Sequence, residues 1–185
     1  MYGHRQAQRE TGFTLVEMMT VLAIVGTLLA IGVPSYNSIT TSARMTSEVN
    51  GLLGDMQYAR SEALRNGEAV SVCVSKDGTS CTGESDWRNG WIVFLNFNAD
   101  DTVDGGDTLL RVQNPLPAKD SVTATDDLGI VTFNRSGFAL GLPAGGTLVT
   151  LHEPESRPSY TRCLTITMAG LLKTQRHADA PDTCL

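Results

Sequence analysis

An apolar run of 21 residues, from Phe13 to Val33, constrains this chain more than any other feature. As an α-helix it would be roughly 31 Å long, which matches the ~30 Å hydrocarbon core of a bilayer. The sequence therefore predicts a membrane-spanning helix. One charged residue, Glu17, lies near the start of the run. A carboxylate in hydrocarbon is costly unless something neutralises it, so Glu17 is a candidate functional residue.

A short polar leader, Met1 to Gly12, precedes the run and carries Arg5 and Arg9 against Glu10. The positive-inside bias predicts that this leader stays cytoplasmic and that the rest of the chain faces outward. Two simpler interpretations compete: a secretory signal peptide cleaved near Ala30-Ile31-Gly32, and an uncleaved anchor. An acidic residue is unusual in the apolar region of a signal peptide, and an uncleaved anchor has no use for a buried glutamate.

Cleavage between Gly12 and Phe13 would give Glu17 a partner. The new α-amino group would lie four residues before the carboxylate. Each subunit would then carry a cation and an anion at matching depth in the membrane.

The segment Gly12-Phe13-Thr14-Leu15-Val16-Glu17, with the apolar run and Pro34 behind it, resembles the class III signal of type IV pilins and type II secretion pseudopilins. The resemblance implies that a prepilin peptidase cleaves after Gly12 and that Phe13 is N-methylated. It also implies that Glu17 pairs with the N-terminal amine of a neighbouring subunit during assembly. The expected location is the bacterial inner membrane, single-pass with a periplasmic C-terminal domain, followed by assembly into a filament.

The acidic balance of the chain, net −6, argues against a general nucleic-acid binder, whose usual footprint is a basic face. Four cysteines in a chain predicted to face outward indicate disulfides. Their spacing suggests Cys73 with Cys81 and Cys163 with Cys184, the second bond tying down a polar tail from Thr174 to Leu185. Four cysteines allow three pairings, so the others stay open. A zinc site is the alternative, but no C-x-x-C spacing is present and His177 is the nearby imidazole.

The division that we expect has four parts: a leader (1–12), the membrane half of a long helix (13–34), an amphipathic half (35–67) and a β-rich domain (68–185). Pro34 ends the strongly apolar stretch and would kink or locally open the helix. After it, apolar residues recur at three- and four-residue steps and define one stripe. Its members are Val49, Leu52, Leu53, Met56, Ala59, Ala63 and Leu64. Asn66-Gly67 supplies the stop signal.

After Gly67 the pattern changes from helical to strand periodicity. Six strands are expected, separated by turns rich in Gly, Asp and Pro. They are Ala69–Ser75, Trp91–Phe97, Thr108–Val112, Gly129–Asn134, Thr147–Leu151 and Thr161–Met168. A helix followed by strands without alternation predicts an α+β fold, with the long helix packed on antiparallel sheet.

Further blocks resemble the GspH, FimT and FimU group of minor pilins and pseudopilins. They are Gln57-Tyr58-Ala59-Arg60-Ser61-Glu62-Ala63-Leu64-Arg65, Val70-Ser71-Val72-Cys73, Trp87-Arg88-Asn89-Gly90-Trp91-Ile92-Val93-Phe94 and Phe133-Asn134-Arg135-Ser136-Gly137. The resemblance implies a structural subunit of a type IV pilus or a type II secretion pseudopilus, which serves filament assembly and protein secretion. Its partners would be other pilins or pseudopilins in a filament.

The alternative is a pilus-tip subunit that binds DNA for uptake in natural transformation. FimT-type proteins are associated with DNA capture through a Gly-Arg-x-Arg element near the C-terminus. This chain reads Gly170-Leu171-Leu172-Lys173 there, and a lysine lacks the planar fork of arginine. The candidate DNA contacts that remain are Lys173 and Arg176.

Other site chemistries find little support in the residues. The acidic segment from Asn98 to Asp107 invites comparison with an EF-hand, but Arg111 stands where a bidentate Glu is required, so we favour a solvated hairpin loop. No nucleophile elbow, phosphate loop or metalloprotease helix is present, so we expect no enzyme, cofactor or metal. Trp87 and Trp91 are expected to be core or rim residues.

Overall fold

A computed structural model describes residues 12–116 and 120–184 of the chain. It divides into two compact units, the first ending at Thr40 and the second beginning at Thr41. One helix, α1 (Leu15–Asn66), contributes residues to both units. The remaining elements are strands and short 3₁₀ turns of the second unit, so the predicted α+β class is confirmed.

Helix α1 continues through Pro34 and ends where the sequence predicts. A proline lacks the N–H that would bond the carbonyl four residues earlier, so the helix has one backbone bond fewer at this point. At the other end, Gly67 adopts φ 72°, and its N–H donates to the carbonyl of Ala63 at 3.0 Å. A left-handed glycine directly after the last helical residue is a common way to end a helix.

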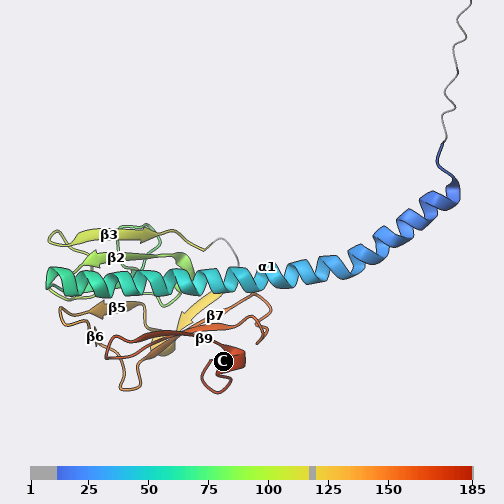
Figure 1. Cartoon of the computed structure of the whole chain (residues 1–185). Helices are drawn as coiled ribbons and strands as arrows, with labels where there is room; N and C mark the ends of the chain where they lie inside the picture. Colours follow the sequence, from blue (N-terminus) through green and yellow to red (C-terminus); the bar gives the residue numbers. More distant parts are fainter. Residues whose placement is uncertain (1–11, 117–119, 185) are drawn as a thin grey trace, which may run out of the picture. The chain divides into compact units, whose positions relative to one another are not determined.

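In the second unit, one face of α1 is buried against the sheets (Figure 1). Its buried apolar residues recur every three to four positions: Met45, Val49, Leu52, Met56, Ala59 and Ala63. The predicted stripe is therefore right in its centre but wrong at Leu64, which is 53% exposed. Leu64 follows Ala63 by one residue, a rotation of about 100°, and it contacts the turn at Gly137 instead of the core.

The strands form two antiparallel sheets with orders β3-β2-β1-β5-β6 and β4-β7-β8-β9. The first contains β1 (Val70–Val74), β2 (Trp91–Leu95), β3 (Thr108–Gln113), β5 (Ile130–Phe133) and β6 (Ala139–Leu140). The second contains β4 (Ser121–Ala124), β7 (Thr147–His152), β8 (Arg162–Ile166) and β9 (Leu172–Arg176). The six expected strands correspond to β1, β2, β3, β5, β7 and β8.

Strands β4, β6 and β9 are additions to the expected set. Strand β6 has two residues, too few for a periodic signal, and β4 buries only Val122 of its four residues. Strand β9 is an edge strand whose last four residues are polar or charged. It overlaps the segment from Thr174 onward, so the expectation of a plain polar tail is wrong over Thr174–Arg176.

Both tryptophans belong to the core, as expected. Trp87 and Trp91 are 0% and 2% exposed, and their ring centroids lie 6.5 Å apart. Each indole N–H has an acceptor: the carbonyl of Leu128 for Trp87, and a carboxylate oxygen of Asp55 for Trp91, both at 2.9 Å. A buried indole keeps its place when its polar atom is satisfied in this way.

Two disulfides join Cys73 to Cys81 and Cys163 to Cys184, the two pairings that the spacing suggests. The first closes a short loop after β1. The second ties the end of the chain to β8, and a contact of 2.6 Å between Nδ1 of His177 and the carbonyl oxygen of Cys184 adds to this connection.

Candidate functional site

The N-terminal motif forms the first turn of α1. The hydroxyl of Thr14 accepts a hydrogen bond from the backbone N–H of Glu17 at 3.2 Å, and the carbonyl of Thr14 accepts one from Met18. Thr14 is therefore the N-cap, and Glu17 is the third helical residue. Phe13, the residue that would become the N-terminus, precedes the cap and is 79% exposed.

The carboxylate of Glu17 stands apart from the other polar side chains of this segment. The hydroxyls of Thr20 and Thr27 donate to the helix carbonyls of Glu17 and Ile24, at 2.9 and 2.8 Å. Thr14 is engaged as the cap. For the Glu17 carboxylate, the described part of the chain (12–116 and 120–184) contains no hydrogen-bond or ion-pair partner. Any neutralising group must come from elsewhere.

The first unit exposes apolar side chains in every direction around the helix. Every residue from Gly12 to Thr40 is exposed, and the best 18-residue window of α1 has a mean hydropathy of 2.2. A helix that is apolar all round is stable in a membrane or inside a bundle of other helices. By length and composition, α1 is long and apolar enough to cross a membrane.

The two candidate DNA contacts do not face the same way. Lys173 and Arg176 both lie on β9, opposite Thr165 and Arg162 of β8. Because side chains alternate along a strand, residues three apart point to opposite faces of the sheet. Arg176 is also committed to an ion pair with Asp179, at 2.9 Å from Nε. The structure therefore does not bring the two cations together.

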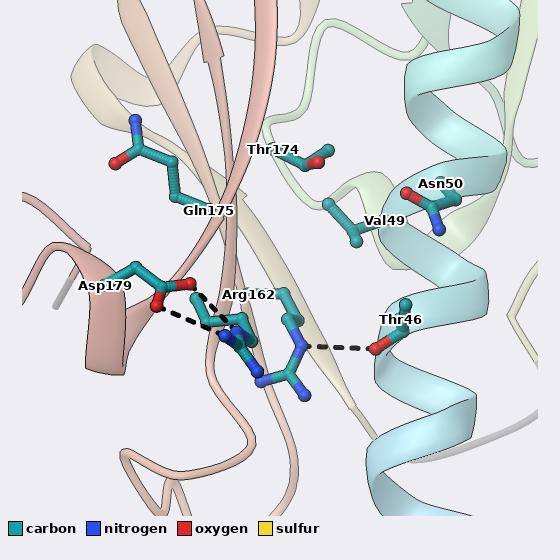
Figure 2. A pocket seen from close by; sticks show the side chains of 8 residues that line it. Thr46, Val49, Asn50, Arg162, Thr174, Gln175 and Asp179 are labelled. Atoms are coloured by element: carbon teal, nitrogen blue, oxygen red, sulfur yellow. Dashed lines mark hydrogen bonds and ion pairs between the residues drawn. The ribbon is translucent and has the colours of Figure 1, made fainter.

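A third cation, Arg162, is the register partner of Arg176 on the neighbouring strand, and both line a pocket between α1 and strands β8 and β9. Figure 2 shows this pocket. The pocket has a volume of about 220 Å³, and Asn50, Thr46 and Asp179 are among its lining residues. Arg162 is 5% exposed. Burial lowers the pKa of its guanidinium and the positive charge of Arg176 lowers this pKa further, while the negative charge of Asp179 opposes them by a smaller amount. In the sequence, Arg162 is one of several C-terminal basic residues, and nothing there distinguishes it.

The acidic segment is a hydrogen-bonded loop in which Asp100, Asp104 and Asp107 accept hydrogen bonds from within the loop or its flanks. Asp107 accepts from the backbone N–H groups of Phe97 and Asp104, and Asp100 accepts from that of Thr102. Arg111, at the position where an EF-hand needs a glutamate, bonds Asp55 at 2.9 Å and stacks on Tyr58. Among the described residues, no group of three or more His, Cys, Asp or Glu side chains is arranged to hold a metal ion.

Two buried carboxylates share one arginine on the other side of α1. Arg44 donates to both oxygens of Asp120, at 2.8 and 2.9 Å, and lies 3.9 Å from Glu48. Neither carboxylate oxygen of Glu48 has a hydrogen-bond partner. Burial, and next the negative charge of Asp120, raise the pKa of Glu48 to about 7. Sequence reasoning missed this group because Asp120 is 76 residues from Arg44.

Two family models match this chain. The family described as "Type II transport protein GspH" matches residues 48–170, and the "Prokaryotic N-terminal methylation motif" matches residues 7–33. The chain belongs to the GspH family of pilins and pseudopilins. Its methylation motif spans Gly12, Phe13 and Glu17, the residues that carry the geometry described above.

Relatives in sequence and structure agree with this family. A type IV major fimbrial protein FimA of Dichelobacter nodosus is 34% identical over 167 residues, which cover 89% of this chain and 94% of that protein. A fimbrial protein of Pseudomonas aeruginosa is 38% identical over 68 residues, 37% of this chain, and the match spans 44% of that relative. Crystal structures of the type IV minor pilin FimU of P. aeruginosa share the fold, with TM-score 0.57 and 21–22% identity. They cover 76–82% of this chain, which in turn covers 98–99% of theirs.

Proposed function

We propose that this protein is a minor pilin or pseudopilin: a non-enzymatic structural subunit held in the inner membrane until it is extracted into a filament. The observation that supports this most strongly is the carboxylate of Glu17, which has no partner among residues 12–116 and 120–184 and lies in a helical segment that is exposed and apolar all round. A charge in that position is costly in lipid. This cost is removed when a neighbouring helix brings a cation to the same depth and the two charges pair.

The cation would be the α-amino group of Phe13, set free when a prepilin peptidase cleaves after Gly12. Thr14 caps the helix through the backbone N–H of Glu17, so the backbone of Glu17 has a fixed place in the first turn. In a bundle of such helices, amine and carboxylate of adjoining subunits lie at one level. Their pairing would set the axial register of the filament.

Replacement of Glu17 tests this mechanism. Glu17→Ala and the near-isosteric Glu17→Gln should insert into the membrane and fold normally, yet fail to enter filaments. Thr20→Val, one turn further along the same helix, is the matched control and should be incorporated like the parent chain. Sheared filaments and membranes are compared by immunoblotting. Normal incorporation of Glu17→Ala would refute the register mechanism.

The choice between a type IV pilus and a secretion pseudopilus needs cells. A pilus subunit predicts that deletion of the gene reduces piliation and twitching, whereas a pseudopilin predicts that it blocks release of secreted proteins. The match to a fimbrial protein over 94% of its length favours the pilus, and the match to the type II transport protein GspH family favours secretion.

DNA capture is the weaker alternative. Its two candidate residues point to opposite faces of β9, and Arg176 is bound to Asp179. A DNA gel-shift with the purified full chain at moderate salt decides whether this protein captures DNA. Retention that is lost in Lys173→Ala and Arg176→Ala would support DNA capture, and no retention ends it.

A further inference from the structure

The guanidinium of Arg162 is buried and has no ion-pair partner among residues 12–116 and 120–184, although the charge of Asp179 acts on it from a greater distance. Four of its five N–H groups have acceptors, and each of these acceptors is an uncharged oxygen. Nε donates to the hydroxyl of Thr46, Nη2 to that of Ser42, and Nη1 to the carbonyls of Ser159 and Thr161, at 3.0–3.3 Å. One N–H of Nη2 has no acceptor in residues 12–116 and 120–184, and no described carboxylate lies within ion-pair distance of this side chain.

The pocket around Arg162 carries a net positive charge. Asp179 is bound in bidentate fashion by Arg176, through Nε at 2.9 Å and Nη2 at 3.2 Å. The charges of Arg176 and Asp179 cancel each other, so this pair does not neutralise the positive charge of Arg162. A buried charge is normally paired, because desolvation without a counter-ion is expensive. Figure 2 shows the Arg162 guanidinium between Thr46 on α1 and Asp179, with Asn50 one turn further along α1.

The pocket can also offer donors to a ligand. Besides the spare N–H of Arg162, the amide of Asn50 is exposed and has no hydrogen-bond partner in the described chain. Nη1 of Arg176 is likewise not used in the pair with Asp179. Two guanidinium groups and an amide around a volume of about 220 Å³ suit an oxyanion, which accepts several charge-assisted hydrogen bonds at once.

We propose that this pocket binds the carboxylate of an aspartate or glutamate side chain presented by a neighbouring filament subunit. The inference rests on the proposed function, since it needs a neighbour. The carboxylate would take the spare N–H of Arg162 and neutralise the buried charge. Charge complementarity supports this occupant. The chain as a whole is net −6, so a neighbouring copy of it presents an acidic surface to this positive pocket.

A single carboxylate fits better than a nucleic-acid backbone. A polyanion needs a basic track that follows its phosphates. Here Asp179 is part of the pocket wall, and Lys173 points away from the face that carries Arg176. The successive phosphates of a nucleic acid would be repelled by this aspartate and by the acidic remainder of the chain.

The first test is an anion titration of the full-length protein in detergent micelles. Sodium acetate is added against sodium chloride at equal ionic strength, and the Nε–H signals of the arginines are followed by NMR. We expect one signal, lost in Arg162→Lys, to shift saturably with acetate and not with chloride. Sodium phosphate is a second probe of the same oxyanion chemistry. No saturable shift with acetate, or an equal shift with chloride, would overturn the inference.

Asn50→Asp keeps the test independent of any folding defect in Arg162→Lys. It supplies a carboxylate within the pocket, so acetate should bind about tenfold or more weakly. Asn114→Asp adds the same charge at an exposed site outside the pocket and should leave acetate binding unchanged. Asp179→Asn removes the competing carboxylate and should strengthen it. Equal acetate binding in Asn50→Asp and Asn114→Asp would contradict the pocket as the site.

The source of the carboxylate is tested in cells with a photo-crosslinking residue in place of Asn50. A crosslink to another pilin subunit supports the inference. Saturable retention of a single-stranded oligonucleotide that is lost in Asn50→Asp would assign the pocket to nucleic-acid phosphate and overturn it. If incorporation depends on Glu17 but acetate does not bind, only the pocket inference fails. If acetate binds but the chain never enters filaments, the proposed function fails.

Discussion

Helix α1 is one element with two different surroundings. In the first unit its side chains are exposed on all faces, and most are apolar. In the second unit the same helix buries one face against two sheets and keeps the opposite face polar. The first segment can therefore gain stability only from lipid or from other helices, whereas the second carries its own core. The difference indicates that the globular unit folds without the apolar segment, which under the proposed function packs in lipid or among other helices.

The largest expected effect contrasts two leucines of this helix. Leu52 is 1% exposed, so Leu52→Ala should lower the free energy of unfolding of the second unit by about 2–5 kcal/mol. Leu22 is 68% exposed, so Leu22→Ala should leave this free energy unchanged within about 0.5 kcal/mol. Urea unfolding in micelles, followed by fluorescence of Trp87 and Trp91, measures both. An equal loss in the two variants would break the comparison.

The next effect concerns the bond that holds the end of the chain. Replacing Cys163 and Cys184 together with serine opens a loop of 21 residues in sequence separation. The chain-entropy estimate is a loss of about 3 kcal/mol in the free energy of unfolding. Proteolysis should then cleave first beyond β9, while incorporation into filaments continues. If this double variant abolished membrane insertion, the two units would not be independent.

A smaller effect is a pH dependence that belongs to the second unit alone. The folded state raises the pKa of Glu48 from 4.5 to about 7, so between these values it holds a proton that the unfolded chain releases. This contribution to stability is present below pH 4.5 and is lost as the pH rises to 7. The described charged groups that face Glu48 are Arg44 on its own helix and Asp120, the residue directly before β4.

Glu48→Gln should remove this decline, and the variant should be more stable than the parent chain at pH 8. Glu68→Gln, at an exposed carboxylate just beyond α1, is the matched control and should keep the decline. Thermal unfolding between pH 4.5 and 8 gives the comparison. A parent chain whose stability rises over that range would contradict the assigned environment of Glu48.

Local patterns predicted much of this molecule. The apolar run, the stripe from Val49 to Ala63, the Asn66-Gly67 stop and six strands follow from periodicity and turn chemistry. Strand β9 was not predicted, because an edge strand that faces water needs no apolar residues and so shows no alternating pattern. The candidate assembly residues Gly12, Phe13 and Glu17 form one contiguous motif and are visible in sequence. The clusters around Arg162 and Glu48 join residues more than 70 positions apart, and tertiary packing alone brings them together.

We propose that Glu17 lies in an apolar helix because its carboxylate pairs with an amine that proteolysis releases. Intact-mass analysis of the protein purified from its own membranes tests this directly. We expect a chain that begins at Phe13 and carries one added methyl group. A mass that still includes residues 1–12 would contradict it.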